Sequence, residues 1–134
     1  MNRDNRLEAI YNRTSFNSLS EIADFVKAFN GLDDRERRDL YIEVVDKYEP
    51  VDAALKNVKE APPQVYDTEE IGGYAGLGRE LVDFIADDEF DYKNADYERI
   101  GENIAHNINL GISPLKIDHD RDPQTGHEFW YWTE

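Results

Sequence analysis

The chain has 134 residues, 40% of them hydrophobic, which suffices for one domain or for two very small ones that share a core. Its 30 acids against 15 lysines and arginines give a net charge of −15, so both nucleic acid and an anionic membrane surface are disfavoured as direct ligands. The absence of cysteine excludes disulfides and thiolate chemistry, and no apolar run is long enough for a membrane span. We therefore expect a soluble cytoplasmic protein whose charge serves solubility, salt adaptation or a basic partner.

The sequence pattern of residues 1–61 predicts helices joined by short connections. The segment 1–15 is polar with one short apolar run, which suits either a strand or half a helix. A helix then starts at Ser18, because Ser18 and Glu21 have the spacing of a capping box, and it ends at Asn30-Gly31. Helices that follow Asp33 and cover 51–59 complete a small helical bundle over residues 16–61. We expect the inner face of the middle helix to contain Leu40, Tyr41, Val44, Val45 and Tyr48.

Residues 62–134 predict a compact α/β portion that begins at the Pro62-Pro63 seam. We expect a short strand at 64–66, helices at about 74–86 and 95–108, and a C-terminal antiparallel hairpin around the turn-rich run 118–126. Gly78 costs about 1 kcal/mol relative to alanine inside a helix, so tight packing against a neighbour is expected there. The predicted fold class is α+β, a small helical bundle followed by this α/β portion.

The segment 67–98 concentrates the negative charge of the chain. Aromatic and aliphatic residues lie between its acids, so the segment can fold and hold the charges in fixed positions, unlike a disordered acidic tail. Arg79 and Lys93 are its only basic residues. The candidate partner-binding residues are Asp67, Glu69, Glu70, Glu80, Asp83, Asp87, Asp88, Glu89, Asp91, Asp96 and Glu98.

Two interpretations of these acids compete. Charged residues on the outer side of helices are ordinary and need no partner. An acid at every third residue of a helix, however, places one charge every ~4.5 Å, comparable to the ~3.4 Å between phosphates along one strand of B-DNA. A rigid acidic helical surface would then present a DNA-like potential to a basic groove.

The residue pattern does not favour catalysis or a metal. Serine and threonine occur in caps and turns, and no nucleophile elbow is present. Asp87, Glu89, Asp91 and Glu98 match four ligand positions of an EF-hand loop, but Tyr92 replaces the required glycine. We expect no catalytic residue, no cofactor and no metal.

Three runs can be compared with a known family: SLSEIADFVKAFNGLDDRERRDLYIEVVDKYEPVDAAL over 18–55, QVYDTEEIGGYAGLGRELVDFI over 64–85, and NADYERIGENI over 94–104. They resemble the ArdA antirestriction proteins, in particular the Leu-Gly-Arg-Glu-Leu and Asp-Tyr-Glu elements of that family. The similarity covers about residues 16–134. Relative to ArdA proteins the chain starts where their middle domain would, so we expect a short form that lacks the N-terminal domain.

The resemblance implies a DNA mimic that occupies the DNA-binding groove of a type I restriction-modification enzyme. It implies a stoichiometric, dimeric inhibitor whose mimic charges are the acids of 67–98, with an extension to Glu36, Asp39, Glu43 and Asp46. The alternative is an acidic adaptor or immunity-type protein that binds a single basic partner. That alternative predicts one aromatic hot spot, at Trp130 or Trp132.

Overall fold

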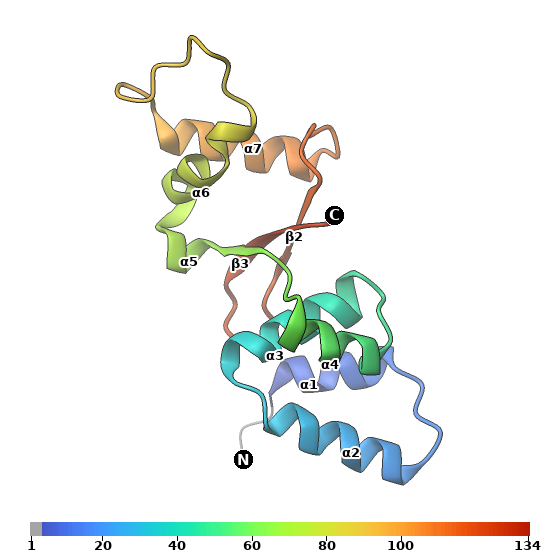
Figure 1. The fold of residues 1–134 in the computed structure, drawn as a ribbon. Helices are drawn as coiled ribbons and strands as arrows, with labels where there is room; N and C mark the ends of the chain where they lie inside the picture. The colour runs from blue at the N-terminus through green and yellow to red at the C-terminus, as the bar shows by residue number, and fades with distance from the viewer. Residues whose placement is uncertain (1–3) are drawn as a thin grey trace. The chain divides into compact units, whose positions relative to one another are not determined.

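A computed structural model describes residues 4–134 and divides into two compact units. The first unit takes the chain up to Pro63 together with Asp122–Thr125, and the second takes Gln64–Arg121 and Gly126–Glu134. Helices and a three-stranded antiparallel sheet make this an α+β protein with a C-terminal hairpin, which confirms the predicted fold class (Figure 1). Within residues 4–134, no helix combines the length and the apolar character needed to cross a membrane.

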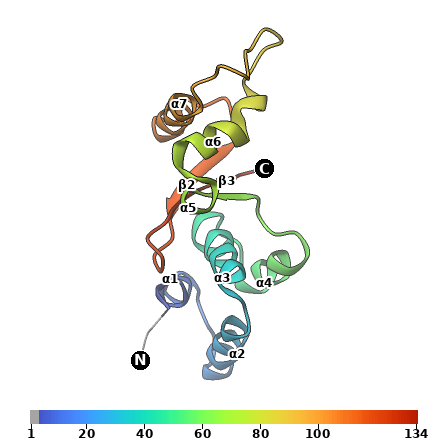
Figure 2. The same cartoon turned by 90° about the vertical axis from the view of Figure 1, so that its left-hand side faces the viewer.

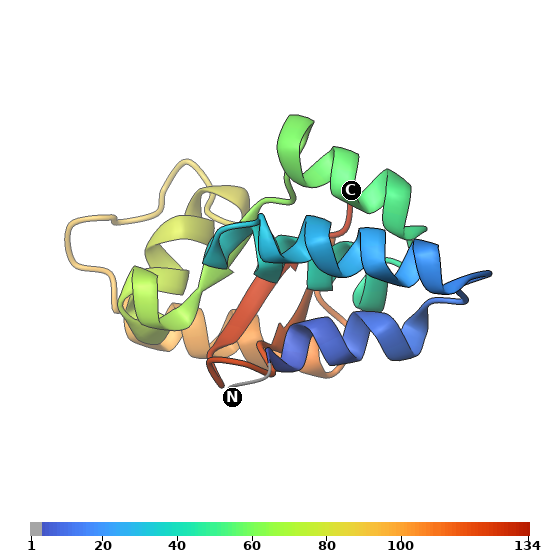
Figure 3. The same ribbon diagram turned by 90° about the horizontal axis from the view of Figure 1, so that it is seen from below.

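The first unit is helical. It contains α1 (Asn5–Arg13), α2 (Leu19–Asn30), α3 (Asp34–Tyr41), a π-helix η1 (Ile42–Asp46) and α4 (Val51–Glu60). Figure 3 views this unit with α2 in front and the α1–α2 connection at its right-hand end. The apolar faces of these helices meet in a core that includes Ile10, Phe29, Leu40, Ile42 and Ala54.

Side-chain caps start three of these helices. The Asp4 carboxylate accepts a hydrogen bond from the Arg6 backbone N–H at 2.9 Å, and this cap resolves the N-terminal segment as a helix. The Ser18 hydroxyl accepts from the Glu21 N–H as predicted, whereas the Glu21 carboxylate accepts from the N–H of Asn17 instead of Ser18. Asp33 and Glu36 form the complete reciprocal box.

The middle helix of the bundle departs from prediction after Tyr41. The chain continues as the π-helix η1, and Tyr48 then adopts a left-handed backbone with φ of 59°. Because a π turn is wider than an α turn, it rotates the following side chains out of the predicted 3.6-residue register. Tyr48 lies beyond the end of this helix and is 75% exposed, so its expected place on the inner face was wrong, while Leu40, Tyr41 and Val44 are buried.

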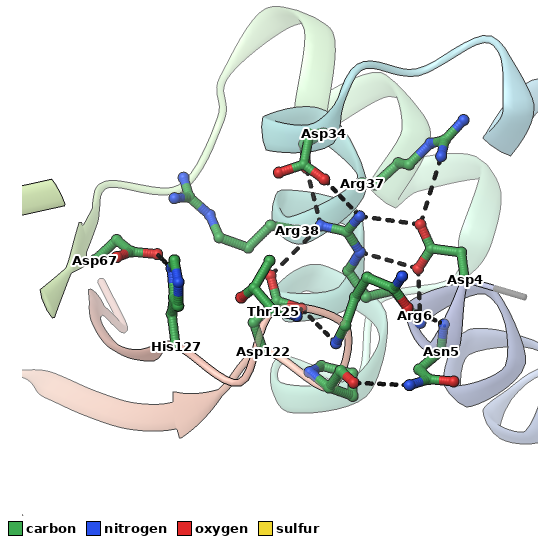
Figure 4. Close-up of polar contacts among 12 residues, drawn as sticks. Asp4, Asn5, Arg6, Asp34, Arg37, Arg38, Asp67, Asp122, Thr125 and His127 are labelled. Atoms are coloured by element: carbon green, nitrogen blue, oxygen red, sulfur yellow. Dashed lines mark hydrogen bonds and ion pairs between the residues drawn. The ribbon is translucent and has the colours of Figure 1, made fainter. Parts of the chain in front are cut away.

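An ion-pair network surrounds Arg6 inside the first unit (Figure 4). The Arg6 guanidinium donates to Asp4 at 2.9 Å and to Asp34 at 2.7 Å, and it lies 3.4 Å from the Asp122 carboxylate. Burial by itself raises the pKa of Asp4, but the hydrogen bonds and charge of Arg6 outweigh it and hold that pKa below its usual value. A buried guanidinium is thus compensated by several carboxylates, as its desolvation requires.

The second unit packs helices against the sheet. Its elements are β1 (Val65–Asp67), α5 (Thr68–Ile71), α6 (Gly73–Leu81), the 3₁₀ turn η2 (Val82–Phe84), α7 (Tyr97–Asn109), β2 (Ile117–Arg121) and β3 (Glu128–Trp132). The strand order is β1-β3-β2, with Tyr66 opposite Trp130 and Ile117 opposite Trp132. A core of Leu77, Leu81, Ile104, Ile108 and Trp130 lies between the helices and the sheet.

The hairpin is formed as predicted, but its first strand lies further along the chain. β2 covers residues 117–121, which the sequence assigned largely to the turn because of Asp118 and Asp120. Those acids are tolerated because β2 is an edge strand, where polar side chains reach solvent. The turn itself is short and is ordered by Asp122, whose carboxylate accepts from the Gln124 N–H.

Helices α6 and α7 cross at two glycines, and Figure 2 shows the two helices side by side. A Cβ on Gly78 would overlap the Tyr97 carbonyl oxygen, and one on Gly101 would overlap the Tyr74 carbonyl oxygen. The backbones therefore touch at this crossing, which confirms the tight packing expected at Gly78. The helix expected to reach residue 86 instead ends at Leu81 and tightens into η2.

Candidate acidic interaction surface

The structure exposes most of the eleven candidate acids. Asp67 is the exception, because it is 4% exposed. The other ten are exposed, and we refer to them together as the acidic surface: Glu69, Glu70, Glu80, Asp83, Asp87, Asp88, Glu89, Asp91, Asp96 and Glu98. All of them belong to the second unit, on α5, α6, η2, α7 and the connection between η2 and α7.

Asp67 has a structural position in the second unit. Its carboxylate caps α5 by accepting from the N–H groups of Glu69 and Glu70 at 2.9 and 3.2 Å. Its other oxygen lies 3.2 Å from Nδ1 of His127 (Figure 4). Asp67 therefore stabilises the start of α5 and does not belong to the acidic surface.

Two acids of the surface order the η2–α7 connection. The Asp87 carboxylate accepts from the Glu89 N–H at 3.0 Å. Asp91 accepts from the backbone of Lys93 and Asn94 and from the Asn94 side chain, and the Asn94 side chain is the main cause that lowers the pKa of Asp91. These bonds are Asx turns, which order the connection locally although it has no regular secondary structure.

Aromatic residues fix the same connection to its neighbours. The Tyr97 hydroxyl donates to the Tyr92 carbonyl at 2.8 Å, and the rings of Phe90 and Tyr92 meet edge to face at 4.8 Å. A hydrogen bond from the Tyr92 hydroxyl to Asp83 raises the pKa of Tyr92. In Figure 1 this connection loops out beyond α6 and α7, and its acids are exposed.

Six members of the acidic surface have no such structural task. Within the described part of the chain, the side chains of Glu69, Glu70, Glu80, Asp88, Glu89 and Glu98 form no hydrogen bond or ion pair. These exposed carboxylates are therefore solvated and are not neutralised by a neighbouring cation of residues 4–134, so their full charge is available to a basic surface.

The predicted helical spacing of charges does not describe the acidic surface. Helix α6 contributes Glu80 alone, beside Arg79, whose guanidinium lies 5.4 Å from the centre of the Tyr97 ring. Most of the acids lie at helix ends and on the η2–α7 connection, where polar caps and turns suit them. On α7, Glu98 and Glu102 are one turn apart, a rise of ~6 Å, near two phosphate steps of ~3.4 Å each along one strand of B-DNA.

The expected extension of the acidic surface onto the middle helix was wrong. Asp39 and Glu43 are 3% and 5% exposed, and Glu36 and Asp46 are half-buried. Asp39 lies 3.0 Å from the Arg38 guanidinium, and burial raises the pKa of both Asp39 and Glu43. The helical period alone did not show this, because Asp39 is buried in an ion pair with Arg38 on α3 and Glu43 lies on the π-helix, where the register changes.

The aromatic hot spot of the alternative hypothesis is also constrained. Trp130 is fully buried, with its ring 5.9 Å from that of Tyr74, so it cannot anchor a partner. Trp132 is half-buried, donates from its indole N–H to the Tyr66 hydroxyl at 3.0 Å and meets Phe84 edge to face. The sequence does not show which of these tryptophans is buried, because residues 129–132 are all aromatic and have no alternation of polar and apolar side chains.

The charge of the chain is divided unequally. The second unit holds sixteen of the 30 acids but five of the 15 lysines and arginines, a net charge of −11, and the first unit holds the remaining −4. Exposed apolar side chains accompany the acids, with Phe84 58% and Tyr92 47% exposed. No group of three or more histidines and acids in residues 4–134 is placed to hold a metal.

No family model, curated protein or solved structure matches this chain. The ArdA resemblance therefore rests on the three sequence runs alone.

Proposed function

We propose that this protein is a DNA-mimic antirestriction inhibitor that binds the DNA-binding groove of a type I restriction-modification enzyme through its acidic surface. Such an enzyme acts on DNA in the cytoplasm, which is where the inhibitor would work. The observation that carries the proposal is the set of ten exposed carboxylates on a folded unit with a net charge of −11. A groove that binds B-DNA is lined by lysines and arginines, so its field is complementary to this surface.

The order of the acidic surface supports the proposal over simple solvation. A solvated acidic face needs no fixed geometry, but Asp83, Asp87 and Asp91 hold the η2–α7 connection through hydrogen bonds. Preorganised charges lose little conformational entropy on binding, so more of their attraction appears as affinity. The free carboxylates next to them, such as Asp88 and Glu89, then meet the basic groove without first breaking a contact.

Competition with DNA tests this function. A labelled duplex bound to a type I methyltransferase complex is titrated with the purified protein at about 50 and 200 mM salt, and displacement at the lower salt is expected. Because DNA binding itself weakens with salt, the affinity of the protein for the enzyme is measured separately by calorimetry. It should fall by about tenfold or more between the two concentrations, since the contacts are ionic and exposed.

Two results would overturn the proposal. Absence of displacement at low salt removes this class of enzyme as the target. Displacement with an affinity that does not change with salt removes charge mimicry as the mechanism, and favours the adaptor with one basic partner, which binds through shape as well as charge.

A further inference from the structure

A cleft of about 780 Å³ opens in the first unit, apart from the acidic surface. The residues that line it come from α2, the α1–α2 connection and the segment from η1 to α4. Sites for ligands typically enclose ~300–1,000 Å³. The cleft is therefore large enough for several side chains of a bound segment.

The floor of the cleft is apolar and aromatic. Phe16 lies in a row of rings, 5.6 Å from Tyr11 and 5.3 Å from Phe25. Val44 and Leu55 continue the apolar lining from η1 and α4. Such a floor favours aliphatic or aromatic side chains of a ligand, because their burial removes apolar surface from water.

Tyr48 stands at the edge of the cleft in a strained and exposed conformation. Its φ of 59° costs about 1–3 kcal/mol for a residue other than glycine, and its side chain is 75% exposed. The Arg13 guanidinium lies over its ring, 4.4 Å from the centre, and donates to the Val45 carbonyl at 3.3 Å. A cation–π contact with Arg13 thus already forms on this ring, and the exposed remainder of the ring is accessible to a second guanidinium.

The charge of the cleft is negative. Four carboxylates line it, from Glu21, Asp24, Glu49 and Asp52, and Arg13 is the single basic residue among the described residues that line it. Asp24 and Asp52 are exposed and form no hydrogen bond or ion pair within the described part of the chain. A cationic ligand would meet these acids beside the ring of Tyr48.

We propose that this cleft binds an arginine-bearing amphipathic segment of a partner protein. An arginine of the segment stacks on Tyr48 and pairs with Asp24 or Asp52, while a neighbouring apolar side chain enters the floor at Phe16 and Phe25. The guanidinium is favoured over an ammonium because it stacks on an aromatic face and keeps its remaining donors for carboxylates. This site is independent of the DNA-mimic function of the second unit.

A peptide titration tests the site. The probe is a fluorescein-labelled peptide of sequence Leu-Arg-Arg-Leu-Leu-Arg-Arg-Leu, and its anisotropy is followed as the 134-residue protein is added. The same peptide with citrulline in place of arginine keeps the shape without the charge and should bind at least about tenfold more weakly. Equal binding of the two peptides would overturn the proposal.

Variants of the cleft locate the binding. Y48G removes the ring but suits a positive φ, so the protein should stay folded and become no less stable, while peptide affinity falls by about tenfold. Y48F keeps the ring and should retain affinity within about twofold. D24N/D52N should also weaken binding and reduce its salt dependence, because two carboxylates are lost.

The matched control is E8Q/E60Q, which removes two exposed carboxylates of the first unit that do not line the cleft. It should leave peptide binding unchanged. If E8Q/E60Q weakens the peptide as much as D24N/D52N, or if Y48G has no effect, then the peptide is attracted by net charge and the cleft is not its site. Because the assay contains no restriction enzyme or DNA, this proposal and the DNA-mimic proposal can fail separately.

Discussion

Buried Glu43 is a cost to stability that the sequence gives no reason to expect. The side chain lies on η1 and is 5% exposed. Burial raises its pKa above the ordinary value, the charges of Glu49 and Asp39 act in the same direction, and Lys47 and a hydrogen bond to Asn57 oppose them. The folded protein therefore holds this group where its charged form is poorly solvated, whereas the same group is freely solvated in the unfolded chain.

We predict that E43Q raises the free energy of unfolding at pH 7 by about 1 kcal/mol. Because the folded pKa of Glu43 lies above the unfolded value of 4.5, its protonation stabilises the folded state. This contribution is fully present below pH 4.5 and is lost as pH rises through the raised pKa. Glutamine resembles the protonated acid, so the gain from E43Q should shrink as pH falls towards 4.5.

Urea unfolding of the wild type and E43Q at pH 7 and pH 4.5 measures this difference. E8Q, at an exposed acid on α1, is the control for the loss of one charge and should change stability little at either pH. A loss of stability in E43Q of similar size at both pH values would show that the contacts of the carboxylate outweigh its desolvation.

At the scale of secondary-structure elements, the crossing of α6 and α7 fixes the geometry beneath the acidic surface. Gly101 lies so close to the Tyr74 carbonyl that a methyl group has no space, and the obstructing atoms are backbone. We predict that G101A destabilises the second unit by about 3 kcal/mol or more. Both tryptophans, Trp130 and Trp132, belong to that unit, so their fluorescence during urea unfolding reports on it directly.

G31A is the matched control for this substitution. Gly31 follows α2 in a right-handed conformation, and an added Cβ would be 3.5 Å from its nearest neighbour, an ordinary contact. It should change the stability of the protein by less than about 1 kcal/mol. Equal stability of G101A and G31A would mean that α6 and α7 separate at little cost.

The sequence predicts most elements and fails where the chain leaves a regular period. Capping residues at Ser18 and Asp33 gave two helix starts, because a cap depends on local hydrogen bonds that neighbouring residues determine. The π-helix at 42–46 has no comparable local signal, and a 3.6-residue period continued through it predicts Tyr48 on the inner face and Glu43 on the outer one. The same limit applies to β2, where Asp118 and Asp120 have turn propensity but pair with β3.

Ten of the eleven candidate acids are exposed, as their charge predicts. Composition could not show which of them order the backbone and which are free to bind a partner. Asp87 and Asp91 order a turn, whereas the Glu89 side chain between them forms no hydrogen bond or ion pair within the described residues, and the three are equivalent in a count of charges. The cleft with Tyr48 was missed altogether, since its walls come from segments up to about forty residues apart in the sequence.

At the scale of the whole molecule, the uneven division of charge separates two explanations of acidity. Solubility or adaptation to salt depends on net charge and is indifferent to which unit carries it. A DNA mimic depends on carboxylates at particular positions, which the second unit holds with a net charge of −11 against −4 in the first. Variants with equal net charge and different location can therefore distinguish the two explanations.

We predict that E80Q/E98Q weakens binding to a type I methyltransferase complex by about tenfold, while E8Q/E60Q, on the first unit, changes it by less than about twofold. Both double variants shift the net charge from −15 to −13, and all four residues are exposed. The slope of log affinity against log salt should also be less steep for E80Q/E98Q, because two exposed charges that would contact the groove are lost. Calorimetric titrations at several salt concentrations measure both quantities. A loss of affinity and slope that is equal in the two variants would assign the attraction to net charge and contradict the placement of the mimic surface on the second unit.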